Sequence, residues 1–219
     1  MIKWVENKLH TIDGRDLISS NNIVDELNIA QLKSLDVINN LTEDDFKNLI
    51  KNGFLSSSEK ILLFDILNLF NSIEVNFNRI LGLNSNSGSG LSGILNPKNS
   101  NPLYNRLFKT DISLAFKKTL QEYIEIRNLI AHGIAKKHLD TNSILFITSN
   151  KSDWNNKLRK RKENPEKLSD RPDRDVLLKE MGEKSIIYAV INVRLLKYLQ
   201  EILMPIDKYF AEYAAIETR

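Results

Sequence analysis

The sequence of 219 residues contains no cysteine, and this absence removes several classes of function. Without cysteine the chain forms no disulfide bond, offers no thiolate ligand to zinc or iron–sulfur clusters, and has no cysteine nucleophile. Histidine is scarce as well. The three histidines, His10, His132 and His138, are too scattered along the chain to predict a metal site. We therefore expect neither a metal ion nor another cofactor.

Long apolar runs are also missing. The N-terminal residues lack the apolar core of a signal peptide, and no stretch approaches the roughly 20 apolar residues of a membrane span. We expect a cytoplasmic protein that does not enter the membrane. The chain is 42% hydrophobic and 27% charged, which is typical of a globular domain with a buried core. Its net charge of +3 permits an anionic partner without requiring one.

Hydrophobic periodicity predicts three long amphipathic helices, at residues 56–81, 111–132 and 174–204. Ser56 and Glu59 have the spacing of a capping box before the first of them. Gly133 follows the second helix, where we expect the left-handed conformation of a helix end. Pro205 follows the third, where it is expected to end or kink the helix.

The other segments are shorter. Residues 1–55 are predicted to form short helical pieces, which we interpret as an N-terminal accessory segment before a main helical domain at 56–219. Residues 84–105 are rich in turn formers. Their glycines are neither preceded by a strand nor followed by the Gly-Lys-Ser/Thr of a phosphate-binding loop, so we expect a flexible connection.

Residues 143–148 (Ser-Ile-Leu-Phe-Ile-Thr) form the one convincing strand-like run. Because a strand is not stable alone, we expect it to pair within a small hairpin or with another subunit. The residues before it, 134–140, are interpreted as a polar connector. Since helices and strands do not alternate along the chain, the predicted fold class is all-α, with the helices packed in a bundle.

Residues 127–133 (Arg-Asn-Leu-Ile-Ala-His-Gly) close the second long helix. At about 100° per residue, Arg127 falls within the apolar face of this helix, whereas Asn128 and His132 are neighbours on its flank. A guanidinium keeps its proton, and burying it without a partner is costly. Arg127 therefore requires a carboxylate, a cleft or a partner chain.

This stretch resembles the Arg-x4-6-His signature of the HEPN superfamily, in which a polar residue commonly follows the arginine, as Asn128 does here. The resemblance implies an up-and-down helical bundle over approximately residues 56–205 and a homodimer whose two motifs meet in an RNA-cleaving cleft. It implies that His132 is the general acid or base and Arg127 the phosphate clamp. Asn128 would orient the histidine or the scissile phosphate. Such proteins commonly serve as toxins or phage-defence effectors that cleave tRNA or mRNA.

The chemistry of these residue types fits that reaction. An imidazole exchanges protons near neutral pH, and a guanidinium offers fixed donors matched to phosphate oxygens. Together they suit transesterification of RNA, in which the ribose 2′-hydroxyl attacks the adjacent phosphorus and leaves a 2′,3′-cyclic phosphate and a 5′-hydroxyl. No metal is needed. One histidine is short of the two acid–base groups that this reaction prefers, and a dimer supplies the second.

A basic tract follows the strand-like run. It begins beside an aromatic residue, and this combination suits single-stranded RNA, because cations track phosphates and rings stack on bases. The candidate substrate-binding residues are Trp154, Lys157, Arg159, Lys160, Arg161 and Lys162. A charge run is also typical of a solvated loop that contacts nothing, and the sequence leaves this alternative open.

Two other functions remain open at this point. One is a non-catalytic helical module of the same fold that binds RNA, a nucleotide or a partner protein. The other is a structural dimerisation protein, in which Arg127 pairs with Glu74 or Glu125 and His132 only caps a helix. Some HEPN proteins also carry a tyrosine, two residues after the histidine, that a partner antitoxin modifies. Ile134 occupies that position here, so an antitoxin partner would have to act by another route.

Overall fold

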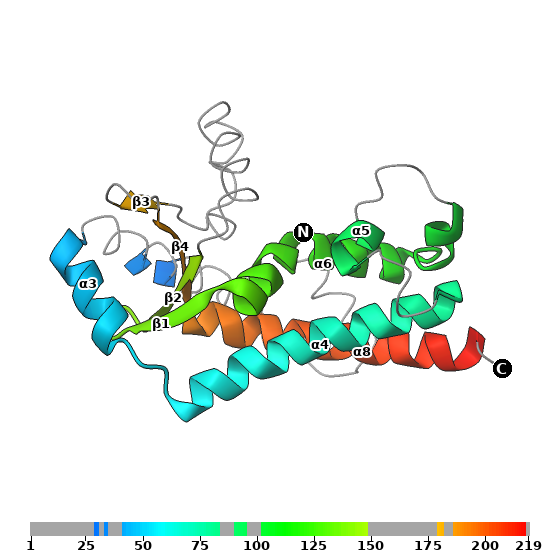
Figure 1. Cartoon of the computed structure of the whole chain (residues 1–219). Coiled ribbons are helices and arrows are strands. Elements are labelled where there is room, and N and C mark those ends of the chain that lie inside the picture. The colour runs from blue at the N-terminus through cyan, green and yellow to red at the C-terminus, as the bar shows by residue number, and fades with distance from the viewer. Residues whose placement is uncertain are drawn as a thin grey trace. The chain divides into compact units, whose positions relative to one another are not determined.

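The computed structural model describes residues 29–30, 33–34, 41–83, 90–95, 102–148, 179–181 and 186–217 (Figure 1). Within these ranges the chain is mostly helical and contains one antiparallel sheet. The residues cluster in two compact units. Unit 1 takes the described residues within 64–127 and 198–217, and unit 2 takes those within 29–63 and 128–197.

Unit 1 contains most of three long helices, α4 (Ser57–Leu81), α6 (Asp111–His132) and α8 (Val193–Glu217); residues 57–63, 128–132 and 193–197 of these helices belong to unit 2. Figure 1 shows them lying alongside one another, with α6 running opposite to α4 and α8. The predictions of helices over 56–81 and 111–132 are therefore confirmed. The candidate motif lies at the C-terminal end of α6.

Both ends of α4 are capped by its own sequence. The Ser56 hydroxyl accepts from the Glu59 backbone N–H at 3.3 Å, and the Glu59 carboxylate accepts from the Ser56 N–H at 2.9 Å. This is the predicted capping box. At the other end, Gly82 has a positive φ of 65°, and Leu83 N–H donates to the Asn78 carbonyl at 2.9 Å. A glycine adopts this left-handed conformation without strain, so the helix ends there.

A cluster of aromatic rings forms the centre of unit 1. Phe77 of α4 meets Phe210 of α8 edge to face, with ring centroids 4.6 Å apart, and meets Phe108 at 5.6 Å. Phe116 of α6 packs against Tyr209 at 5.3 Å in the same manner. Each such pair contributes about 0.5–1.5 kcal/mol beyond the burial of its area. These contacts hold the three helices together.

Part of the segment predicted to be a flexible connection, 84–105, is instead structured. A short helix, α5 (Leu91–Leu95), buries its three large apolar residues, and its last carbonyl accepts from the Gln121 amide of α6 at 2.8 Å. A 3-10 helix, η1 (Pro102–Arg106), follows. The prediction was wrong for these residues because turn formers and glycines around Leu91 mask an apolar turn. Residues 84–89 and 96–101 lie outside the described ranges.

Unit 2 contains a sheet with strand order β1-β2-β4-β3 in the described part of the chain, and all of its pairs are antiparallel. The strands are β1 (Ile134–His138), β2 (Ser143–Thr148), β3 (Lys179–Met181) and β4 (Ile186–Asn192). The predicted strand at 143–148 and its hairpin are confirmed. The predicted polar connector at 134–140 is wrong, since most of it forms β1.

The helix α3 (Glu43–Asn52) covers part of this sheet. Its capping box at Thr42 and Asp45 starts the helix, as the carboxylates in this turn suggest. Phe46 and Leu49 of α3 belong to one buried cluster with three residues of the strands, Leu145, Ile147 and Val190. Residues 29–30 and 33–34 are also helical. The predicted boundary at residue 55 stays a prediction.

The chain between 174 and 204 differs most from its prediction. A single long helix was expected there, but residues 179–192 contribute β3 and β4, and α8 begins only at Val193. Asn192 caps α8, because its side-chain oxygen accepts the backbone N–H of Arg194 at 2.9 Å. Pro205 lies inside α8, so it does not end the helix. The described chain is mostly helical, as the predicted fold class requires, but its sheet is larger than the predicted hairpin.

Candidate functional site

The candidate motif occupies the last turns of α6. Phe116, Leu120 and Tyr123 are buried along the predicted apolar face of this helix. His132 lies five positions after Arg127, which in a helix is a rise of about 7.5 Å and a rotation of roughly 140°. The two candidate side chains of one chain therefore leave the helix on different sides.

The guanidinium of Arg127 faces α4. Its Nη2 donates to the Asn71 side-chain oxygen at 3.5 Å and lies 3.9 Å from the Glu74 carboxylate. The side chains of Arg127 and Glu74 are each 24% exposed, so both keep contact with water. Glu74 is thus the carboxylate that Arg127 required. The sequence did not predict Asn71 as a partner of Arg127, although Asn71 lies three residues before Glu74, at the spacing of neighbours on one helix face.

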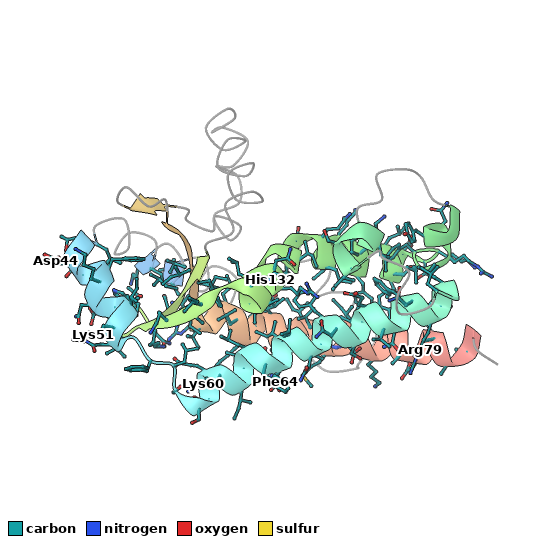
Figure 2. The ribbon with its side chains drawn as sticks, in the orientation of Figure 1. Asp44, Lys51, Lys60, Phe64, Arg79 and His132 are labelled. Carbon is teal, nitrogen blue, oxygen red and sulfur yellow. The ribbon has the colours of Figure 1, made fainter. Side chains whose placement is uncertain are left out.

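His132 is the last residue of α6, and its side chain is exposed (Figure 2). Among the residues that the structure describes, it has no hydrogen-bond or ionic partner. Asn128, one turn earlier, is half-buried. An imidazole exposed at a helix end is accessible to a substrate or to a second chain.

Gly133 does not adopt the left-handed conformation predicted for it, since Gly82 is the one glycine with a positive φ in the described ranges. A Cβ on Gly133 would lie 2.6 Å from the Leu129 carbonyl oxygen and 3.3 Å from the Phe146 Cβ. The Gly133 N–H donates to that same carbonyl at 2.8 Å. A glycine is required here because the chain turns directly from α6 into β1 beside β2.

A buried ion pair anchors the strand that follows the motif. Lys137 of β1 is 8% exposed, and its ammonium donates to the Glu59 carboxylate and, at 2.6 Å, to the Asn142 side-chain oxygen. Burial by itself would raise the pKa of Glu59. The hydrogen bonds from Lys137 and from Ser56 outweigh it, so the pKa of Glu59 lies below its ordinary value of 4.5. The pair fixes β1 to the start of α4.

The lowered pKa of Glu59 makes this anchor sensitive to acid. Its interactions stabilise the fold above pH 4.5 and are lost as the pH falls through the lowered value in the folded chain. We expect Glu59→Gln to lower the free energy of unfolding by about 3 kcal/mol near neutral pH, since it leaves Lys137 buried without its carboxylate. This difference from wild type should shrink in acid. Urea denaturation at several pH values measures it.

Asp44→Asn is the matched control for that experiment. The Asp44 side chain is 95% exposed and pairs with the exposed Lys47, so its loss should change stability by less than about 0.5 kcal/mol at every pH. A difference between Glu59→Gln and wild type that stays constant from neutral pH to pH 3 would rule out the proposed role of the ionised carboxylate.

The candidate substrate-binding residues lie outside the described ranges. They are Trp154, Lys157, Arg159, Lys160, Arg161 and Lys162. Their role in binding RNA stays a prediction. Ile134, which stands where some HEPN proteins carry a modified tyrosine, is 64% exposed at the start of β1.

Comparison with protein families, with curated proteins and with solved structures found no match for this chain. None of the helices in the described ranges combines the length and the apolar character of a membrane span. The described side chains also include no group of three or more His, Cys, Asp or Glu residues arranged to hold a metal ion.

Proposed function

We propose that this protein is a metal-independent endoribonuclease of the HEPN type that works as a homodimer. The observation that carries the proposal is the end of α6, where His132 is exposed and Arg127 remains partly exposed about one and a half turns earlier. An acid–base group and a phosphate-binding group are thus both accessible near one helix end. The proposed substrate is tRNA or mRNA in the cytoplasm, and the proposed role is that of a toxin or phage-defence effector, with an antitoxin or regulatory protein as a partner.

In the proposed reaction, the imidazole of His132 accepts the proton of a ribose 2′-hydroxyl. The 2′-oxygen forms a bond to the adjacent phosphorus, and the bond from phosphorus to the 5′-oxygen breaks. A second imidazole returns a proton to that leaving oxygen. Arg127 donates to the phosphate oxygens and stabilises the charge that builds on them. Asn128, on the His132 flank of the helix, orients the imidazole or the phosphate.

The geometry of α6 favours a site shared by two chains. Because Arg127 and His132 leave one helix roughly 140° apart, a single chain is poorly suited to place both groups on one phosphate. In a two-fold dimer the same surface of each chain meets its copy, so His132 of the partner subunit supplies the second imidazole. The proposed site is complete only in the dimer.

Dilution tests this dependence. In excess EDTA, the rate of cleavage of a single-stranded RNA, divided by the chain concentration, should fall as the protein is diluted through the range where the dimer dissociates. Analytical ultracentrifugation gives that range independently. A rate per chain that stays constant while the protein becomes monomeric would show that one chain suffices and would overturn the shared site.

A non-catalytic module is the second candidate, and one observation favours it. The ion pair of Arg127 with Glu74 supplies the guanidinium with an internal partner, as a structural role requires. Under this function the motif holds the helices together, and the chain is either a structural dimerisation protein or a module of the same fold that binds RNA, a nucleotide or a protein. Replacing Arg127 would then lower stability without any loss of cleavage, because wild type itself would not cleave.

A further inference from the structure

An exposed aromatic ring lies beside the strand that follows the motif. Phe54, in the connection between α3 and α4, is 74% exposed. The Lys136 ammonium of β1 lies 5.2 Å from the centroid of its ring, within the distance of a cation–π contact. Alternate residues of a strand point to the same side, so Ile134, which is 64% exposed, shares the side of Lys136. We call Phe54, Lys136 and Ile134 the Phe54 surface.

The backbone holds this ring in place. The Lys137 N–H donates to the Gly53 carbonyl at 3.0 Å, which joins the connection to the edge strand β1. A Cβ on Gly53 would lie 2.7 Å from the Lys137 carbonyl oxygen, so the two backbones meet at a distance that only glycine permits. The backbone next to Phe54 is therefore held against β1, so this part of the chain needs little ordering on binding.

Two further cations flank the connection that carries the ring. Lys51 and Lys60 are exposed, and Figure 2 shows them on either side of the 53–56 connection, at the end of α3 and in the first turn of α4. The nearby carboxylate of Glu59 is already held by Lys137. An accessible ring flanked by cations matches a ligand that carries both phosphates and flat bases.

We propose that the Phe54 surface binds single-stranded RNA, with a base stacked on Phe54 and phosphates held by Lys136, Lys51 and Lys60. From Lys136 the strand β1 leads back through Ile134 toward His132, so the bound RNA continues to the end of α6. That this RNA is the strand to be cut rests on the proposed function. The binding surface itself does not, because stacking and phosphate contacts require no cleavage.

Fluorescence anisotropy with a labelled single-stranded RNA of about 12 nucleotides tests the inference, and the His132→Ala chain is used so that the RNA stays intact. Phe54→Ala should weaken binding on the order of tenfold, since one stacked base is lost. Phe54→Leu should weaken it similarly, because it keeps the bulk and loses the ring face. Phe54→Trp should bind at least as well as the parent. Lys136→Ala should make the affinity less sensitive to salt. The slope of log affinity against log salt concentration should fall by the amount expected for about one phosphate contact.

Phe64→Ala is the matched control, because Phe64 is 62% exposed on α4 and takes no part in the Phe54 surface. Phe64→Ala should bind the RNA with the same affinity as the His132→Ala chain in which the variants are made. The inference is overturned if Phe54→Ala and Phe64→Ala bind equally, if a duplex RNA shows the same dependence on Phe54, or if no RNA binds. It is equally overturned if Phe54→Ala changes only the association between chains.

This test separates the inference from the proposed function. If binding depends on Phe54 but wild type cleaves no RNA, the nuclease proposal fails and the Phe54 surface stands. If wild type and Phe54→Ala cleave RNA at the same rate and Phe54→Ala does not change the affinity for RNA, the nuclease proposal stands and the Phe54 surface is wrong.

Discussion

His132→Ala is expected to lower the rate of RNA cleavage by about 100-fold or more, because it removes the group that transfers the proton. The loss should appear in the single-turnover rate with saturating enzyme, where substrate binding no longer limits the reaction. The fold should be unaffected, because His132 is exposed and has no partner among the described residues. Thermal unfolding of both proteins measures this directly.

Leu139→Ala is a suitable control for this variant. Leu139 is 81% exposed in the turn that follows β1, and it has no part in the proposed chemistry. It should cleave at the wild-type rate. If His132→Ala also cleaves at that rate, then His132 is not the acid or base, and the site proposed at the end of α6 is wrong.

Arg127→Ala should lower kcat/KM by about 100-fold or more, the scale of a lost donor to a developing oxyanion. Arg127→Lys should recover only part of this loss, because an ammonium lacks the planar fork that matches two phosphate oxygens. The effect on stability should be small. Both Arg127 and Glu74 keep contact with water at 24% exposure, and a screened pair of this kind contributes about 1 kcal/mol or less.

The effects of Arg127→Ala on kcat/KM and on the free energy of unfolding decide between the nuclease and the non-catalytic role. A large loss of kcat/KM with a small loss of unfolding free energy, measured by urea denaturation, supports the phosphate-binding role. Lys118→Ala removes an exposed cation from the same helix and should change neither quantity. A loss of activity no larger than that of Lys118→Ala, or one that merely follows unfolding of the chain, would assign Arg127 to the structural role.

The helices that the sequence predicted correctly carry their own signals. In α4 and α6 the apolar residues recur with helical spacing, and Ser56 with Glu59 supplies a cap that depends on neighbours alone. The strand β4 was missed because its β-branched and aromatic residues, among them Tyr188 and Val190, also fit one face of a helix. Pairing with β2 decides between the two, and that partner lies about forty residues earlier in the chain.

The candidate site, like the fold, could be predicted from the sequence only in part. The position of Arg127 on an apolar face required a partner, and Glu74 was one of two candidates in the sequence. Asn71 could not be chosen from spacing alone, because a neutral amide is common on the wet face of a helix. The anchor between Lys137 and Glu59 depends on the strand β1, which appeared in the sequence as a polar connector.

The most direct test of the account is the chemistry of the cleaved ends. Wild type should cut RNA in excess EDTA, leave 2′,3′-cyclic phosphate and 5′-hydroxyl ends, and fail to cut a 2′-O-methyl RNA of the same sequence. His132→Ala should leave all of these RNAs intact over the same time. Cleavage that requires a divalent metal, or that leaves 3′-hydroxyl and 5′-phosphate ends, would contradict attack by the 2′-hydroxyl and with it the proposed roles of His132 and Arg127.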